Sequence, residues 1–201
     1  MQSEVGCPAD FDPSCAATHL AYDASVDVWL KTLSMPAGSY SYLAAINDSF
    51  TEVYGAHAVR SGANIPLTAA SASNIKFYYD AKTNWITDNV NPIMAVLFGS
   101  FQSELGCTAD FDPSCLRSWL EDIDGDGIYS FSALLPAGSY DAKIAINESF
   151  DENYGQGGVA GGLNITFVSD GRRTMRFEYC SVTHLLGIGA SCGPHIYYVE
   201  K

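Results

Sequence analysis

Three aspartates at alternate positions form the cluster best suited to hold a cation, and they are Asp122, Asp124 and Asp126. They stand in the run Glu-Asp-Ile-Asp-Gly-Asp-Gly, which looks like the start of a calcium-binding loop rich in carboxylate oxygens. The bidentate glutamate that would complete such a loop is missing, because Ala133 stands at its position. Asp-Gly pairs are also typical of a plain hairpin turn. Two interpretations therefore stay open, a calcium site and a turn, and no other cofactor is predicted.

The cysteines predict structural disulfides rather than redox or metal chemistry. Two pairs share one spacing, Cys7 with Cys15 and Cys107 with Cys115, and a third pair, Cys180 with Cys192, occurs only in the second half. The four histidines stand at no ligand-like spacing to these cysteines, which disfavours zinc. A repeated, even set of cysteines indicates an oxidising compartment, so we expect an extracellular or cell-surface protein.

Nothing in the sequence predicts catalysis. No Ser/His/Asp or Cys/His set recurs, and the cysteines are expected to be bonded. Carboxylates are plentiful, yet no glycosidase-like pair can be nominated from their spacing. The formal net charge of −13 argues against nucleic acid and anionic membrane surfaces as partners. No apolar run reaches the roughly 18 residues needed to cross a bilayer, so no membrane insertion is expected.

The strongest signal is an internal repeat. Shifted by 100 residues, the sequence matches itself without a gap from Gln2 to Asn89, so that QSEVGCPADFDPSC becomes QSELGCTADFDPSC. Self-similarity of this kind predicts two homologous domains. We place them at residues 1–91 and 92–201, with the junction around Asn89–Pro92.

The elements that must position these residues are short strands. Runs such as MAVLFGSF, SYDAKIAI and TMRFEY are separated by Pro-Ala-Gly-Ser, Asp-Gly-Asp-Gly and Gly-Gly turns, with no amphipathic helix between them. This pattern predicts an all-β fold of two tandem antiparallel, immunoglobulin-like β-sandwiches. Each carries a short disulfide-stapled loop with Pro13 or Pro113 in its turn. Such a loop is either a structural staple or a rigid platform that presents Phe11 or Phe111.

Three triplets match the acceptor pattern for N-glycosylation. They begin at Asn47, Asn147 and Asn164. Because such triplets also arise by chance, their occupancy stays open.

The combined motifs resemble a known family. GCxxDFDPxC, followed by LPAGSY, NESFDENYG and KFYYDAKTNWITDN, is similar to the X25-type modules of bacterial pullulanases and related amylolytic enzymes, once per repeat. The resemblance implies a secreted, non-catalytic β-sandwich accessory domain that assists α-glucan binding. Sugars stack on aromatic rings while polar groups bond their hydroxyls. The matching positions are Phe11, Phe50, Tyr54, Trp85, Phe111, Phe150, Asp151, Glu152, Asn153 and Tyr154. The same aromatics also suit a buried core.

The two ends differ in a way that suggests assembly. An apolar segment, residues 93–101, precedes Gln102, whereas only Met1 precedes Gln2, so we expect the first domain to lack its opening strand. Aligning Pro194 with Pro92 lays the C-terminal tail on that opening strand. The candidate donor residues are His195, Ile196, Tyr197, Tyr198 and Val199.

The main functional prediction is a fibre. The tail of one copy would fill the open groove of the next by β-augmentation, which gives a non-closing, head-to-tail polymer. The alternative is an α-glucan-binding accessory module of a secreted amylolytic enzyme. The start of the chain lacks a signal peptide, so we expect either a removed leader or a piece of a larger exported protein.

Overall fold

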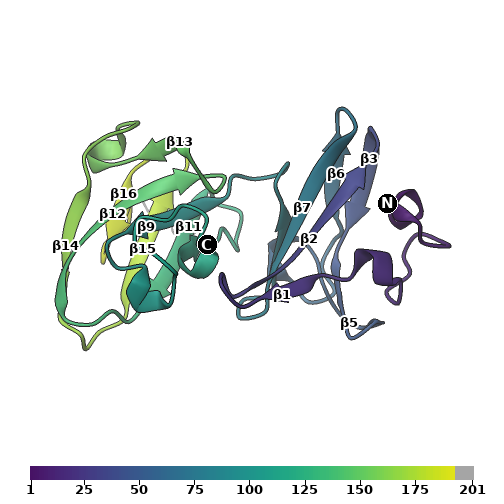
Figure 1. Cartoon of the computed structure of the whole chain (residues 1–201), viewed down its shortest axis with the longest axis horizontal. Helices are drawn as coiled ribbons and strands as arrows, with labels where there is room; N and C mark the ends of the chain where they lie inside the picture. Colours follow the sequence, from purple (N-terminus) through teal and green to yellow (C-terminus); the bar gives the residue numbers. More distant parts are fainter. Residues whose placement is uncertain (193–201) are drawn as a thin grey trace, which may run out of the picture. The chain divides into compact units, whose positions relative to one another are not determined.

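The computed structural model describes residues 1–192 and divides into two compact units, Met1–Ile93 and Met94–Lys201. Both units consist of short antiparallel strands and single 3-10 turns, so the predicted all-β antiparallel fold is confirmed (Figure 1). The donor residues proposed from the sequence, 195–199, lie outside the described residues. In the described part, no helix has the length and apolar character needed to span a membrane.

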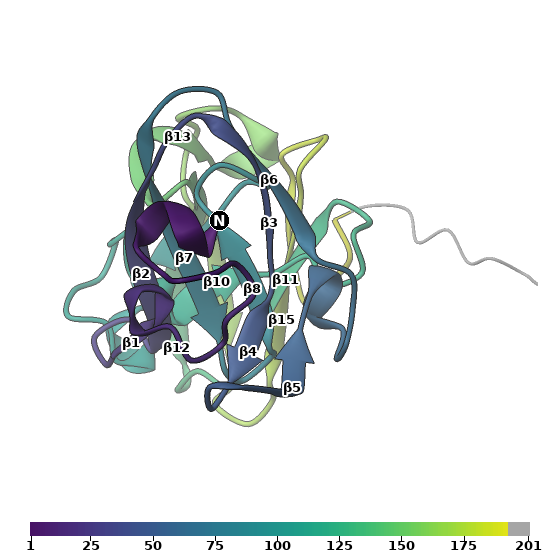
Figure 2. The ribbon, with the colours of Figure 1, turned by 90° about the vertical axis from the view of Figure 1, so that its right-hand side faces the viewer.

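Unit 1 contains eight strands and three 3-10 turns. Its strands are β1 (Ala21–Asp23), β2 (Val28–Met35), β3 (Gly38–Tyr42), β4 (Ala44–Ile46), β5 (Ser49–Tyr54), β6 (Ile65–Ala69), β7 (Ser73–Asp80) and β8 (Trp85–Asp88). Its 3-10 turns are η1 (Gln2–Val5), η2 (Ala16–Thr18) and η3 (Ala56–Ala58). One sheet has the order β1-β2-β7-β8, while β3 pairs with β6 and β4 with β5 (Figure 2).

The core of unit 1 lies between the β2-β7-β8 sheet and the two strand pairs. Buried residues alternate with exposed ones along β6, as expected for a strand with one buried face. Tyr42 meets Phe77 edge to face with ring centres 5.1 Å apart. The core residues are Leu33, Met35, Tyr42, Ala44, Leu67, Ala69, Ile75, Phe77, Tyr79 and Ile86.

Unit 2 repeats this plan, with an additional first strand, β9, and with one continuous strand, β12, in the place of β3 and β4. Its strands are β9 (Ala95–Gly99), β10 (Trp119–Leu120), β11 (Ile128–Ala133), β12 (Gly138–Ile146), β13 (Ser149–Tyr154), β14 (Ile165–Ser169), β15 (Met175–Cys180) and β16 (Leu186–Ile188). Its 3-10 turns are η4 (Ser103–Leu105), η5 (Leu116–Ser118) and η6 (Gln156–Gly158). The larger sheet has the order β10-β9-β12-β13, with β14 also on β12, and the smaller sheet has the order β11-β15-β16.

Aromatic side chains fill the space between the two sheets of unit 2. Phe101 stacks on Phe177, with ring centres 6.1 Å apart, and Phe167 meets Phe177 edge to face at 5.4 Å. The packing of one sheet on the other through such contacts makes unit 2 a sandwich. Its immunoglobulin-like character stays a prediction.

The extra strand, β9, lies in the middle of the larger sheet of unit 2. It pairs with β12 from Ala142↔Gly99 to Ile146↔Ala95 and with β10 on its other side, and every residue of it is buried. In unit 1 the counterpart of β12 is interrupted at Leu43, which separates β3 from β4. Among the described residues, no strand of unit 1 pairs with β4 on the side that β9 takes in unit 2.

All three cysteine pairs predicted from the sequence are bonded. Cys7–Cys15 and Cys107–Cys115 each close a loop of the same length, and Cys180–Cys192 ties the residues after β16 to the end of β15. Short closed loops of this kind stabilise a fold by about 2–3 kcal/mol each in the chain-entropy model.

Candidate functional site

Three phenylalanines of unit 2 form an aromatic cluster with two exposed members. Phe98, on the buried strand β9, meets Phe150 edge to face at 5.5 Å between ring centres and Phe111 at 6.4 Å. Phe98 is 3% exposed, whereas Phe150 is 54% and Phe111 37% exposed. Edge-to-face contacts fix the two outer rings while leaving part of their faces in water. An exposed, fixed aromatic surface suits the apolar face of a sugar.

Local backbone geometry fixes both outer rings. Phe111 has a φ of 55°, in the left-handed region, inside the loop closed by Cys107–Cys115, and its N–H donates to the Gly99 carbonyl at 3.0 Å. Phe150 lies on β13, directly after a hairpin turn in which Asn147 and Glu148 both have a φ of 56°. Left-handed residues are uncommon outside glycine and asparagine, so these turns are specified tightly.

Polar residues follow Phe150 along β13. Asp151 and Glu152 are exposed, and the Tyr154 hydroxyl donates to Glu152 Oε1 at 2.8 Å. This hydrogen bond, followed by burial, raises the pKa of Tyr154. Asn153 is half-buried and donates from Nδ2 to the Phe150 carbonyl at 2.9 Å, while its Oδ1 is buried without a partner. The residues predicted from 150 to 154 therefore lie together, some as surface groups and some as supports.

The corresponding residues of unit 1 are arranged around an open groove. Phe11 and Phe50 are 58% and 54% exposed and line a groove of about 640 Å³. The Tyr54 hydroxyl donates to Glu52 Oε1 at 2.7 Å, as its counterpart does in unit 2. Trp85 differs from the other candidates because it is only 7% exposed on β8 and offers no ring face to a ligand.

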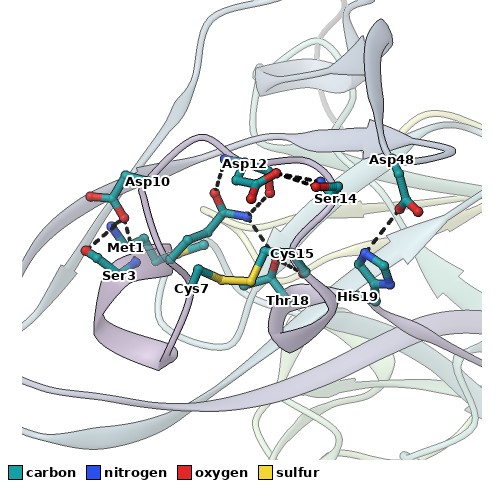
Figure 3. Close-up of a disulfide and its surroundings, with 11 residues drawn as sticks. Met1, Ser3, Cys7, Asp10, Asp12, Ser14, Cys15, Thr18, His19 and Asp48 are labelled. Carbon is teal, nitrogen blue, oxygen red and sulfur yellow. Dashed lines mark hydrogen bonds and ion pairs between the residues drawn. A yellow bond between two sulfur atoms is a disulfide. The ribbon is translucent and has the colours of Figure 1, made fainter.

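The Cys7–Cys15 disulfide closes a loop beside this groove (Figure 3). One glutamine organises this loop. Gln2 donates from Nε2 to the Asp12 carbonyl at 2.7 Å and to Thr18 Oγ1 at 3.0 Å, and its Oε1 accepts the Asp12 N–H at 2.7 Å. Gln102 makes the same contacts in unit 2 with Asp112 and Ser118. The loop is therefore held from inside by both a disulfide and a polar side chain, whichever role it plays.

A tyrosine–histidine stack in unit 2 was not anticipated from the sequence. The rings of Tyr154 and His184 are parallel with centres 3.9 Å apart, and Tyr179 Oη lies 2.8 Å from His184 Nδ1. Burial, followed by the neighbouring Tyr154, raises the pKa of Tyr179. In unit 1 the equivalent bond runs from Tyr79 to Asn84, at 2.7 Å. The one sequence signal that could have indicated this stack is the replacement of Asn84 in the first repeat by His184 in the second.

The aspartate run of unit 2 is a tight turn between β10 and β11. The carboxylates of Asp122, Asp124 and Asp126 lie within 4.8 Å of one another. Asp122 Oδ1 accepts the N–H groups of Gly125 and Asp126, and Oδ2 accepts that of Gly127. Burial raises the pKa of Asp122, although these N–H bonds oppose the shift. The turn is thus closed by its own backbone, and calcium binding stays a prediction.

The three sequon asparagines, Asn47, Asn147 and Asn164, are all exposed. Their glycosylation stays a prediction. Among the described residues, the polar contacts of histidine side chains are His19 with Asp48, at 3.1 Å, and His184 with Tyr179. Neither places a serine or cysteine nucleophile beside an imidazole, so neither resembles a nucleophilic active site.

Comparison with known proteins agrees with the repeat. The family model of the pullulanase X25 domain matches residues 1–86 and again residues 94–186. Each match covers most of one unit, so the family occurs here in two copies.

Curated relatives and one solved structure were also found. An amylopullulanase of Thermoanaerobacterium thermosulfurigenes is 32% identical over 156 residues, which are 75% of this chain and 8% of that protein. One of Thermoanaerobacter thermohydrosulfuricus is 31% identical over 191 residues, 92% of this chain and 13% of that protein. The pullulanase from Bacillus acidopullulyticus is 21% identical, with a TM-score of 0.46, over 88% of this chain and 18% of its own. The chain thus spans only a small part of the length of each.

Proposed function

This chain belongs to the pullulanase X25 domain family, and we propose that it is a pair of non-catalytic accessory modules that help a secreted amylolytic enzyme to hold α-glucan. The printed names of the relatives, amylopullulanase and pullulanase, support an association with enzymes of this kind. The bonded cysteine pairs support an extracellular location, because disulfides persist in oxidising compartments.

One observation indicates which surface of unit 2 would hold the glucan. Phe111 and Phe150 are exposed rings fixed on the buried Phe98, and they are accompanied by the carboxylates of Asp151 and Glu152. A sugar ring stacked on such a surface buries its apolar face while its hydroxyls meet the acidic groups. The proposed contact residues are Phe111, Phe150, Asp151 and Glu152, with Asn153 and Tyr154 as supports. Trp85 is left out because it is buried.

The direct test is retention of the purified chain on insoluble starch, with cellulose as the matched control polymer. The proposal expects retention on starch alone, together with release by soluble maltooligosaccharide. Equal recovery from both polymers would contradict it.

The head-to-tail fibre is the second candidate, and the groove of unit 1 is the observation that favours it. The comparisons support the accessory module better, since they connect the chain to enzymes rather than to polymers. The fibre would need residues 195–199 of another copy as its donor. Electron microscopy of the intact chain and of a chain without residues 194–201 tests it, and polymers that need the tail are the result it requires.

A further inference from the structure

The groove of unit 1 lies where unit 2 has a strand. Its walls are formed by the segments around Leu20 and around Ala44–Ile46, and its floor includes Leu33 and Phe77. The counterparts of the two walls in unit 2 are β10 and the second half of β12, and β9 pairs with both of them. The groove therefore coincides with the position of β9 in the repeat.

Burial in the two units shows what the strand covers. Leu120 and Ile146, which pair with β9, are 0% and 2% exposed, whereas their counterparts Leu20 and Ile46 in unit 1 are half-buried. The smaller Ala44 stands in unit 1 where unit 2 has Ile144, which widens the groove. Unit 1 thus leaves apolar surface and one strand edge without the cover that the repeat provides.

In unit 2 the ends of β9 are held by groups outside the sheet. The Met94 N–H donates to Asn147 Oδ1 at 3.0 Å, and the Asn147 N–H donates to the Met94 carbonyl at 2.8 Å. At the other end, the Phe111 N–H donates to the Gly99 carbonyl at 3.0 Å. These three bonds define where the strand begins and ends.

Unit 1 keeps the same groups in the same conformations. Asn47 has a φ of 55° and Phe11 a φ of 57°, against 56° and 55° for Asn147 and Phe111. In the part of the chain that the structure describes, no hydrogen bond is formed by the N–H of Asn47, its Oδ1 or the N–H of Phe11. A left-handed conformation is costly for a residue such as phenylalanine, and here it is retained without the strand that uses it.

We infer that the groove of unit 1 is a binding site for one extended polypeptide segment with the sequence pattern of β9. The segment would pair antiparallel with Tyr42–Ile46 in the register of β9 on β12, with its ends held by Asn47 and Phe11. Addition of a strand to an open sheet edge is a common mode of peptide recognition, in which backbone bonds give affinity and side-chain pockets give specificity.

Two positions of β9 set the specificity. A Cβ on Gly99 would overlap the carbonyl oxygen of Asp141, whose counterpart in the groove is Ser41. Ala95 is 0% exposed and pairs with Ile146, so a larger side chain there would have to displace buried neighbours. The C-terminal tail is a poorer match, because Tyr197 falls at the position of Ala95 and Lys201 at that of Gly99 when Pro194 is aligned with Pro92.

The first test measures peptide binding to the intact chain. A fluorescent peptide copying residues 93–101, with two added lysines for solubility, is titrated with the protein and followed by polarisation. Saturable binding is expected, and the Gly99→Val peptide should bind at least about tenfold more weakly, because the added side chain overpacks the edge. Absence of binding, or equal binding of both peptides, would overturn the inference.

Variants of the groove locate the bound peptide. Asn47→Gly keeps the left-handed turn but removes the Oδ1 acceptor, so about fivefold weaker binding is expected. Asn47→Asp keeps that acceptor and serves as the matched control. Equal affinity of the two variants would show that the peptide binds elsewhere.

A second design does not need a soluble free peptide. A copy of residues 93–100 is fused directly before Met1, where it has the same spacing to Gln2 that residues 93–100 have to Gln102. The fusion should raise the melting temperature of unit 1 by several degrees and abolish peptide binding, while a fusion carrying Gly99→Val should do neither. Displacement of the free peptide by maltoheptaose, or tighter binding of a peptide of residues 194–201, would also overturn the inference.

Discussion

The hydroxyl of Tyr42 donates to Asp88 Oδ2 at 2.6 Å in the interior of unit 1, and the two residues stand on different sheets. Asp88 is 0% exposed and also accepts the N–H groups of Val90 and Asn91. Burial, followed by the charge of Asp88, raises the pKa of Tyr42. One carboxylate therefore joins a strand of the groove wall to the last strand of unit 1.

Replacement of Tyr42 by phenylalanine tests this junction. The variant leaves the carboxylate buried with one bond fewer, and we expect a loss of about 1.5–3 kcal/mol in the free energy of unfolding of unit 1. Differential scanning calorimetry resolves the result if the transition of unit 2 serves as internal control, since Ala142 and Ile188 stand at the equivalent positions. A variant as stable as the parent chain would show that the bond contributes nothing.

Alkaline pH should destabilise both units through buried tyrosines. Burial raises the pKa of Tyr79 and of Tyr129 to about 12. The unfolded value is about 10, so the unfolded state loses these protons first, and stability is retained below pH 10 and lost as the pH rises toward 12. Absorbance at 295 nm should show a late class of tyrosines that titrates together with unfolding. Tyr79→Phe and Tyr129→Phe should remove members of that class.

Removal of the exposed rings of unit 2 should weaken glucan retention. Phe150→Ala or Phe111→Ala takes away one stacking surface, and we expect a three- to tenfold loss in retention on starch, from about 0.5–1.5 kcal/mol of stacking. Val168→Ala, at another exposed apolar residue of unit 2, on β14, is the matched control. A control that loses as much as the phenylalanine variants would contradict the proposed surface.

The aspartate turn gives two distinguishable outcomes. Asp122→Ala removes the acceptor of three backbone N–H groups, so we expect about 1–3 kcal/mol lower stability of unit 2. If the turn also binds calcium, millimolar calcium should raise the melting temperature of unit 2 in the parent chain but not in Asp124→Asn. A plain turn predicts no response to calcium in either protein.

Much of the fold could be predicted because its signals are local or duplicated. The cysteine pairs repeat at one spacing, and the shift of 100 residues carries every turn of the first unit onto the second. The open groove also followed from comparing the segments before Gln2 and Gln102.

The parts that escaped prediction depend on packing between distant residues. The sequence alone does not show whether Trp85 is exposed or buried. Its position on β8, where every residue is buried, decides that it is buried. Phe98 looked like one apolar residue among several, and its contact with Phe111 and Phe150 required the position of β9 in mid-sheet. The stack of His184 on Tyr154 joins segments that no local pattern connects.

The groove of unit 1 leaves the edge of β4 unpaired among the described residues, and this affects how the protein behaves at high concentration. Bare strand edges recruit other chains and seed aggregates, and natural sheets discourage this with charged side chains. The groove is lined by three charged residues that can discourage such pairing, Lys31, Asp48 and Glu52. Salt screens charges of this kind, so the solubility of the chain should fall as ionic strength rises, even though its fold is unchanged.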